Sequence, residues 1–370
     1  MQNIIIKDER NYQVISGNAI TILNELPASI YELSFIPNEG FSLNEADGYF
    51  NITEKLYGQI ETITKRVLHT FETVTGNLGV LFSGPKGLGK SLTLRNICKE
   101  AVEKELPIIL VNKHFDNIGS FIDTIRQSVV VVFDEFEKHY LDRNKTDRED
   151  LEGQDSLLNL FDSTLNGKKL FLLSCNDIGN ISEYLLNRPG RLHYHFRMHR
   201  LSIDEITEYC MDNLDKENSE LIPEILSMGA LISDFSYDML RSIIFELNIY
   251  KCGLQEARKI LNIEARSKSP FNYTIYFQSG KTETGFDYID TTNKHYRLDW
   301  YAKTDGSRND VMVDMTKLQW TGNNNGSLLL ENKHICLLNK EVKDHNNIEK
   351  IVFIPAKEGY LDAGNDWDSL

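Results

Sequence analysis

Residues 84–91 read GPKGLGKS and fit the pattern G-x-x-x-x-G-K-[ST] in full. The apolar run LGVLFS precedes them, and a segment with helical spacing of apolar residues follows them. In this context glycines let the backbone curl until its N–H groups converge on phosphate oxygens, and the start of the helix adds a positive dipole end. The predicted phosphate-binding residues are Gly84, Pro85, Lys86, Gly87, Leu88, Gly89, Lys90, Ser91 and Leu92.

Two side chains of this loop have separate expected roles. Lys90 would reach the β- and γ-phosphates of ATP, and Ser91 would bind Mg²⁺. The alternative is a glycine-rich turn that fits the pattern by chance. It is disfavoured because strand, loop and helix occur together in the right order.

Polar residues also end the next apolar runs. VVVVF leads into Asp134 and Glu135, and carboxylates are costly to bury without a partner. Beside a phosphate site, Asp134 would bind Mg²⁺ and Glu135 would activate an attacking water as a base. Asn176 follows KLFLLSC, and we expect it to hydrogen-bond the water or the γ-phosphate. The alternatives are a strand that ends at solvent and a turn-forming asparagine.

The segment NRPGR holds Arg188 and Arg191 three positions apart, with proline and glycine between them. A turn of fixed shape that presents guanidinium groups is suited to binding an anion. The alternative is a structural turn whose arginines pair with surface carboxylates. These residues alone do not say whose anion would be bound.

Composition narrows the class of protein. The chain has 370 residues, a net charge of −15 and a pI near 5.1, which argues against a broad basic face for nucleic acid but not against a local basic groove. Five scattered cysteines without C-x-x-C spacing predict a reduced, intracellular protein. No apolar stretch approaches eighteen residues, and the N-terminal run is too short for a signal peptide. We therefore predict a cytoplasmic protein with no membrane partner.

The pattern of apolar residues predicts how the chain is divided. Residues 1–48 form a small N-terminal element with short strands, and a helix follows from a cap at Asn51 or Thr53. Apolar strands then alternate with helices to about residue 200, which predicts an α/β fold with a parallel sheet covered on both faces.

Beyond residue 200 the pattern of apolar residues changes twice. Residues 201–268 have helical patterns that open with a predicted cap at Ser202. Residues 270–358 contain strand-like runs separated by turn sequences, which predicts a small β-rich C-terminal domain. Residues 359–370 form an acidic tail.

These features together resemble the AAA+ ATPase superfamily, and within it the classical AAA type, over about residues 50–265. The resemblance rests on GPKGLGKS, VVVVFDEFE, SCND and NDIGNISEYLLNRPGR, the last of which is similar to the second region of homology of classical AAA proteins. The segments DEFEK and NRPGRLHYHF most resemble the corresponding sequences of short AAA ATPases encoded by phages. For a virus-encoded protein the expected location is the host cytoplasm.

The resemblance implies an AAA+ P-loop domain with a nucleotide-binding subdomain over residues 49–200 and a helical lid over residues 201–268. It also implies self-assembly into a homo-oligomeric ring, most often a hexamer. In such a ring Arg188 and Arg191 would project into the ATP site of the next subunit as arginine fingers.

Other positions are left open by the resemblance. The turn at Leu56, Tyr57 and Gly58 would lie near the adenine, and either Arg241 or Arg258 would serve as a lid arginine that senses nucleotide. Phe115 or Phe121 would be a pore aromatic, and the alternative for both is packing in the core.

The function expected from these residues is an ATPase that uses ATP and Mg²⁺ to remodel or translocate a protein substrate, with a chaperone-like role. The β-rich domain and the N-terminal element would then recognise the substrate or an adaptor protein. The alternative is an AAA+ ATPase that works on nucleic acid as a replication, loading or packaging factor, and a third reading is a scaffold whose ATP binding only drives assembly.

Overall fold

A computed structural model of the chain describes residues 3–8, 11–16, 21–37, 40–46, 52–140, 160–161, 167–181, 183–186, 191–232, 234–263, 269–289, 294–303, 306–321, 327–337 and 348–356. The chain divides into two compact units. The first consists of Met1–Lys55, Gln59–Ser83 and Ser91–Arg197, and the second of Leu56–Gly58, Gly84–Lys90 and Met198–Leu370.

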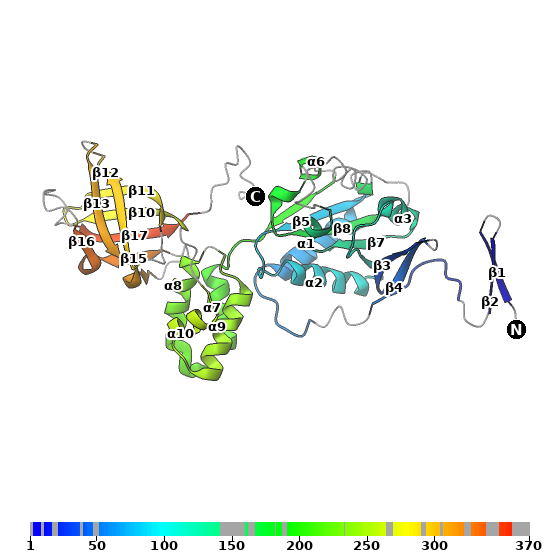
Figure 1. Ribbon diagram of the computed structural model, residues 1–370, viewed down its shortest axis with the longest axis horizontal. Helices are drawn as coiled ribbons and strands as arrows, with labels where there is room; N and C mark the ends of the chain where they lie inside the picture. The colour runs from blue at the N-terminus through cyan, green and yellow to red at the C-terminus, as the bar shows by residue number, and fades with distance from the viewer. Residues whose placement is uncertain are drawn as a thin grey trace. The chain divides into compact units, whose positions relative to one another are not determined.

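The first unit is built on a mostly parallel sheet (Figure 1). Within the described residues its seven strands lie in the order β4-β3-β6-β7-β8-β5-β9, and only the β3–β4 pair is antiparallel. The strands are β3 (Ile30–Ile36), β4 (Gly40–Glu45), β5 (Leu78–Ser83), β6 (Ile108–Leu110), β7 (Val129–Phe133), β8 (Lys169–Cys175) and β9 (Tyr194–Arg197). Every residue of β5, β7 and β8 is buried, as expected for parallel strands covered on both faces. The predicted α/β fold with a parallel sheet is confirmed.

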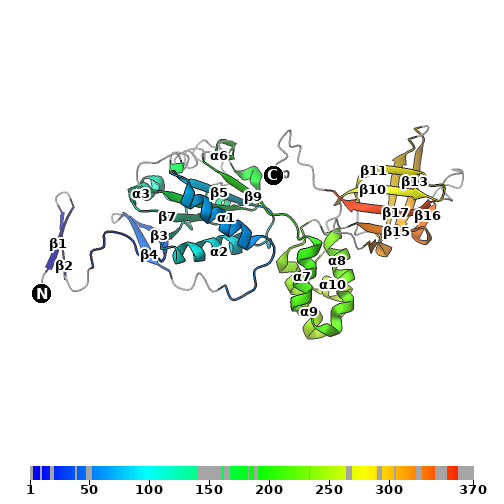
Figure 2. The same cartoon turned by 180° about the vertical axis from the view of Figure 1, so that it is seen from behind.

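Helices pack on both faces of this sheet. They are α1 (Ile60–Thr73), α2 (Lys90–Glu103), α3 (Ile118–Thr124), α4 (Phe136–Tyr140) and α6 (Glu183–Leu186), with a 3₁₀ turn η2 (Ile178–Asn180). Figure 2 shows α1 and α2 together along one face, where Asn96 Nδ2 of α2 donates to Thr64 Oγ1 of α1 at 2.9 Å. On the opposite face, apolar side chains of α3, α4 and α6 pack with alternate residues of β7 and β8.

The N-terminal segment contributes to the sheet. β1 (Asn3–Asp8) and β2 (Asn11–Ser16) pair as a hairpin of their own. β3 instead pairs in parallel with β6 and carries β4 on its other edge, so this hairpin extends the central sheet. The small N-terminal element predicted over residues 1–48 left open which sheet its strands join, because short alternating strands do not reveal this.

The first helix begins later than predicted. α1 starts at Ile60, and residues 52–59 are not helical, so the expected cap at Thr53 is wrong. Gly58 has a φ of +66°, a left-handed conformation that a helix does not accept. Asn51 lies outside the described residues.

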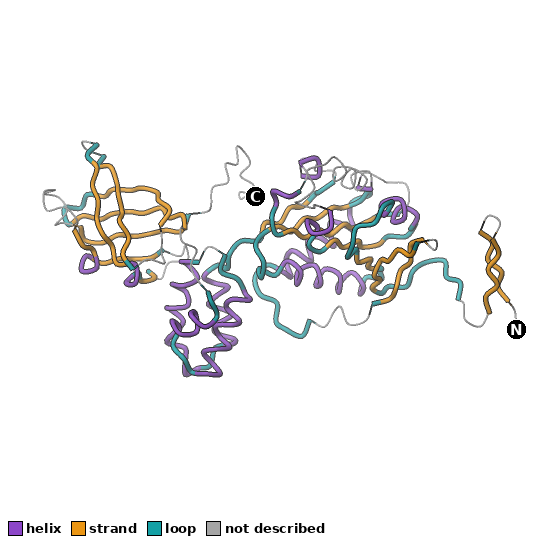
Figure 3. Tube along the Cα trace, in the orientation of Figure 1, coloured by secondary structure: helices purple, strands orange, loops and turns teal. Residues whose placement is uncertain are grey.

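The second unit opens with a group of helices, purple in Figure 3. They are α7 (Ile203–Asn213), η3 (Lys216–Leu221), α8 (Ile222–Leu231), α9 (Tyr237–Tyr250) and α10 (Leu254–Ile260), which enclose one apolar core. The predicted cap at Ser202 is confirmed: its hydroxyl accepts from the Glu205 amide, and the Glu205 carboxylate accepts from the Ser202 amide, which is a capping box.

The C-terminal part of the second unit is an antiparallel β-rich region, which confirms that part of the predicted fold class. Its described strands form a sheet of five, β11-β10-β17-β15-β14, and a sheet of three, β12-β13-β16. Their bounds are β10 (Ser269–Phe277), β11 (Thr282–Ile289), β12 (His295–Tyr301), β13 (Arg308–Asp314), β14 (Gln319–Trp320), β15 (Leu328–Glu331), β16 (Ile335–Leu337) and β17 (Ile348–Pro355), with 3₁₀ turns η4 (Met315–Lys317) and η5 (Asn332–His334).

Two of these strands, β11 and β14, form where the sequence has no clear strand-like run. In β11 a glycine and acidic residues weaken the strand signal. A glycine is needed at position 285, because a Cβ there would lie 2.2 Å from the hydroxyl oxygen of Tyr273. The predicted acidic tail, residues 359–370, lies outside the described residues. No helix in the described ranges is both long and apolar enough to cross a bilayer.

Candidate active site

The glycine-rich loop follows β5 directly and ends at the first residue of α2. Gly84, Gly87 and Gly89 all have positive φ, at +139°, +79° and +86°, a conformation that side chains rarely tolerate. The Lys90 side chain is 6% exposed, and its ammonium donates to the carbonyl oxygens of Gly84 at 2.6 Å and Pro85 at 2.7 Å. The charge of Lys90 is therefore held against the loop that the sequence assigns to phosphate.

The same loop packs on the start of α9 within the second unit. The Tyr237 amide donates to the Gly87 carbonyl at 3.1 Å. A Cβ on Gly87 would lie 2.8 Å from both Asp238 Oδ2 and Ser236 Oγ, so no side chain fits there without movement. The Ser236 hydroxyl also caps α9. The sequence predicts the loop, but no local pattern predicts its packing on α9.

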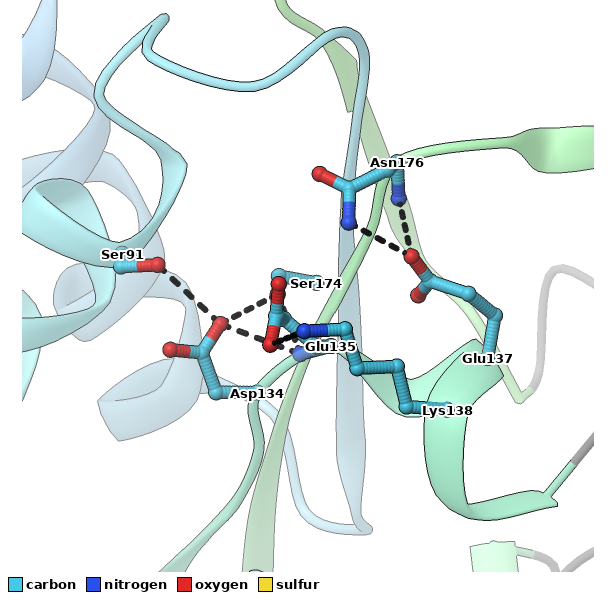
Figure 4. Close-up of polar contacts among 7 residues, drawn as sticks. All are labelled: Ser91, Asp134, Glu135, Glu137, Lys138, Ser174 and Asn176. Carbon is cyan, nitrogen blue, oxygen red and sulfur yellow. Dashed lines mark hydrogen bonds and ion pairs between the residues drawn. The ribbon is translucent and has the colours of Figure 1, made fainter.

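Asp134 forms the centre of a polar group in the first unit, shown in Figure 4. Its Oδ1 accepts from Ser91 Oγ at 3.2 Å, from Ser174 Oγ at 2.5 Å and from the amide of Glu135 at 3.1 Å. Ser91 comes from the first turn of α2, Asp134 follows β7, and Ser174 lies in β8. The structure thus brings together the two residues predicted to bind Mg²⁺.

These oxygen donors fit Mg²⁺. The ion prefers oxygen ligands and is bound in phosphate sites by one or two protein side chains, with phosphate oxygens and waters completing six positions. Ser91 Oγ and Asp134 Oδ1 already adjoin each other. The part of the chain that the structure describes contains no group of three His, Cys, Asp or Glu residues able to hold a metal by themselves.

Glu135 has an unusual backbone and a charged partner. Its φ is +50°, and its amide donates to Ser174 Oγ at 2.8 Å as well as to Asp134. Its carboxylate forms an ion pair with Lys138, three residues along in α4, and this hydrogen bond raises the pKa of the Lys138 ammonium. Left-handed backbone at a non-glycine residue is uncommon and concentrates at functional sites.

Asn176 follows β8 and is held by the carboxylate of Glu137. Glu137 Oε1 accepts from the Asn176 amide at 2.9 Å and from Asn176 Nδ2 at 2.7 Å. Figure 4 shows the side-chain oxygen of Asn176 on the side away from Glu137. Asn176 is thus held by α4, the helix that also carries Lys138, the partner of Glu135. Its expected contact with the water or the γ-phosphate stays a prediction.

The structure describes only one of the two arginines of the NRPGR turn. Arg188 lies outside the described residues. Arg191 is buried, with 8% of its surface exposed. A Cβ on Gly79 of β5 would lie 1.9 Å from the Arg191 carbonyl oxygen, so the backbone at Arg191 runs tightly along the sheet. The prediction that these arginines act on a neighbouring copy stays a prediction.

Aromatic residues surround the turn that was expected near the adenine. The Tyr57 ring lies 4.8 Å from that of Tyr209 and 6.0 Å from that of Tyr237, between ring centroids. Burial raises the pKa of Tyr237, and the nearby carboxylate of Glu205 raises it further. A Cβ on Gly58 would lie 2.3 Å from Glu205 Oε1. The sequence indicated Tyr57 and Gly58, but not the tyrosines of α7 and α9.

The structure also describes the candidate pore aromatics and the candidate lid arginines. Phe115 and Phe121 pack against the core of the first unit, where Phe121 stacks on Phe41 at 4.8 Å, which favours the core-packing alternative for both. Arg258 Nε donates to the Ile263 carbonyl at 2.9 Å. The nucleotide-sensing role of either Arg241 or Arg258 stays a prediction.

Three residues of the polar group were not predicted: Ser174, Glu137 and Lys138. Ser174 had a signal in the sequence, because it is a polar residue that directly follows the apolar run LFLL of β8, and in the structure it is 1% exposed. Glu137 and Lys138 follow Glu135 in a charged segment, and charges there are also expected on any solvated helix. Only their contacts reveal a role.

Comparison with known proteins identifies the domain. Residues 80–200 match the family model of the ATPase family associated with various cellular activities (AAA). No curated protein matches the chain. Among solved structures, the chain is similar to a proline-to-glycine mutant of RuvB from Thermotoga maritima, at 16% identity over 57% of this chain and 72% of that chain, with a TM-score of 0.38. The segment from residue 80 to residue 200 therefore belongs to the AAA family, which is part of the AAA+ superfamily.

Proposed function

We propose that this chain binds Mg²⁺·ATP and hydrolyses it. The observation that carries the proposal is the contact between Ser91 and Asp134, 3.2 Å between oxygens, at the start of the helix that follows the glycine-rich loop. Chance similarity to a phosphate loop would not require a carboxylate at this point from the end of β7, which β8 separates from β5 in the sheet. Family membership of residues 80–200 supports the same conclusion.

Each residue of the site has a proposed role. Backbone N–H groups of residues 86–91 and the Lys90 ammonium would bind the phosphates, and Ser91 and Asp134 would hold Mg²⁺. When bound, the ion would neutralise charge on the phosphates and orient them. Glu135 would accept a proton from the attacking water, and Asn176 would orient that water or the γ-phosphate.

The proposal extends to a shared site between copies. Arg188 and Arg191 would complete the ATP site of the next subunit in a homo-oligomeric ring, as the resemblance to classical AAA proteins implies. Because Arg191 is buried in the single chain, its guanidinium would need a change of side-chain position or of the surrounding segment on assembly. Arginine fingers contribute about 10³–10⁵ in rate in phosphoryl transfer.

The proposed substrate is a protein. The net charge of −15 disfavours a broad contact with nucleic acid, and the antiparallel β-rich region supplies a second folded part that can recognise a partner. Hydrolysis would then drive remodelling or translocation of that protein. The second candidate is work on nucleic acid, which a local basic surface would support and which a strong salt dependence of DNA binding would reveal.

The test is the ATPase rate per chain as protein concentration rises. Wild type is compared with Glu135→Gln, with Arg188→Ala/Arg191→Ala and, as a control for loss of arginine elsewhere, with Arg66→Ala/Arg95→Ala. We expect a rate that rises with concentration, and an arginine double variant that binds ATP but loses at least about 10³ in rate. A rate that is independent of concentration and survives loss of both arginines would overturn the shared site.

Substrate class is tested in the same assay. An unfolded protein and single- and double-stranded DNA are added separately at two salt concentrations. Stimulation by the unfolded protein alone supports the main proposal, and salt-sensitive stimulation by DNA alone supports the second candidate.

A further inference from the structure

Helix α4 connects two of the proposed catalytic side chains. It is anchored in the core by Phe136, fully buried, and Tyr140, 5% exposed, whose rings stack at 4.6 Å. Between these anchors, Glu137 accepts two hydrogen bonds from Asn176, and Lys138 pairs with Glu135. A short helix that is fixed by its aromatic residues therefore holds the tips of two strands through its charged ones.

The hydrogen bonds to Glu137 determine which way the Asn176 amide faces. A carboxylate only accepts, so the Nδ2 group of Asn176 must be the part that contacts Glu137 Oε1. The second bond, from the Asn176 main-chain N–H to the same oxygen, fixes the position of the carboxylate as well. The side-chain oxygen of Asn176 is thereby turned away from Glu137 and left as an acceptor (Figure 4).

The second carboxylate oxygen of Glu137 indicates that this residue does more than stabilise the fold. Oε2 is buried and has no hydrogen-bond partner among the described residues. A buried polar atom without a partner costs free energy and is uncommon, so its retention calls for a reason beyond packing. An apolar residue at this position would avoid that cost but would release Asn176.

We infer that Glu137 is a positioning residue of ATP hydrolysis that acts through Asn176. It holds the asparagine so that its side-chain oxygen accepts a hydrogen bond from the attacking water. The inference rests on the proposed ATPase activity. It goes beyond that proposal because it assigns a role to Glu137 and chooses the water over the γ-phosphate as the partner of this oxygen.

The test is a double-mutant cycle on ATP hydrolysis with Glu137→Ala, Asn176→Ala and the pair. We expect each single variant to lower kcat by about 10- to 100-fold, since misplacing a catalytic group by about 1 Å can cost 10². Because Glu137 acts through Asn176, the double variant should be no slower than Asn176→Ala. Glu137→Gln keeps one acceptor oxygen and should recover most of the rate. Glu72→Ala, which removes an exposed carboxylate paired with Lys104, is the control.

Affinity for Mg²⁺ and a non-hydrolysable ATP analogue separates positioning from a structural role. We expect Glu137→Ala to leave this affinity within about twofold of wild type, because Asn176 would not hold the phosphates. Effects of the two single variants that multiply in the pair, or a loss of analogue affinity equal to the loss of kcat, would overturn the inference.

A readout that needs no turnover keeps the inference separate from the proposed function. In protein labelled with ¹⁵N-asparagine, the side-chain amide signal of Asn176, identified with Asn176→Ala, should move in Glu137→Gln. If that signal moves while wild type hydrolyses no ATP, the contact is correct and the proposed activity is wrong. If the signal is unchanged, Glu137 does not hold Asn176 in solution and the inference fails whatever the ATPase assay shows.

Discussion

Ser174 Oγ lies 2.5 Å from Asp134 Oδ1 and also accepts from the amide of Glu135, 2.8 Å away. Ser174 lies in β8 and Asp134 directly follows β7, and these strands are parallel neighbours. One hydroxyl thus fixes both the carboxylate proposed to bind Mg²⁺ and the backbone of the proposed base. This relationship explains why a polar residue occupies a fully buried strand.

Replacing Ser174 by alanine should therefore impair the site more than the fold. Asp134 loses its shortest partner and the Glu135 amide loses one of two acceptors, so we expect kcat for ATP to fall by about tenfold or more. The free energy of unfolding should fall by about 1–3 kcal/mol, the cost of a lost buried hydrogen bond. Urea unfolding and steady-state kinetics measure the two effects.

Ser227→Ala is the matched control, because Ser227 is half-buried and its hydroxyl donates to the Pro223 carbonyl of its own helix, away from the site. It should change neither quantity appreciably. Full activity in Ser174→Ala would show that Asp134 and Glu135 need no support from β8.

The geometry of the glycine-rich loop gives a second prediction. Gly87 and Gly280 have the same φ, +79°, but a Cβ on Gly87 would meet Asp238 and Ser236, whereas a Cβ on Gly280 would meet nothing within 4 Å. Gly280→Ala should therefore cost only the backbone strain, about 1 kcal/mol of unfolding free energy, and leave ATP binding unchanged. Gly87→Ala should cost more and should also weaken ATP binding by at least about tenfold, because the loop must move away from α9. Calorimetric titration with ATP and urea unfolding compare the two variants, and equal ATP affinity in both would contradict the prediction.

Much of the fold and part of the site could be predicted because they depend on local patterns. The apolar runs of β5, β7 and β8 have no polar face, and only a sheet covered on both sides accepts such strands. Ser91 and Asp134 stand at fixed places in a loop and at a strand end, so their types and spacing indicated their shared chemistry.

The contacts that no local pattern specifies could not be predicted. Glu137 is one charged residue among several in its segment, and its bond to Asn176 spans 39 residues. In β3 and β4, apolar and polar residues alternate as in any exposed hairpin. Tertiary packing decides that β3 pairs with β6. The late start of α1 follows from the conformation of Gly58, which apolar periodicity does not detect.

A third prediction concerns the ion pair between Lys138 and Glu135. The positive charge stabilises the ionised form of its partner, so replacing Lys138 by methionine should shift the acid limb of the pH–rate profile for ATP hydrolysis to higher pH. Both side chains are partly exposed, at 50% and 37%, so solvent screening should keep the shift below about one pH unit. Rates from pH 5 to pH 9 measure it.

Lys65→Met, which removes a lysine from an exposed pair with Glu61, is the control and should leave the profile unchanged. A shift to lower pH in Lys138→Met would mean that the lysine does not stabilise the carboxylate during turnover.

The last prediction concerns stability and pH. His195 lies in β9, and its Nε2 is 2.7 Å from Ser83 Oγ in β5. Burial, and to a smaller extent the charge of Arg197, lowers the pKa of His195 from 6.5 to about 4. Because the unfolded chain takes up a proton at a higher pH than the folded one, stability should be full above about pH 6.5 and fall as the pH drops towards 4. The loss from this residue is at most about 3 kcal/mol. His195→Gln keeps a hydrogen-bonding group without the titration, so the unfolding free energy of wild type minus that of the variant should decrease from pH 7.5 to pH 4.5. Urea unfolding at both pH values measures this difference, and a difference that stays constant would show that His195 is not held neutral against Ser83 of β5.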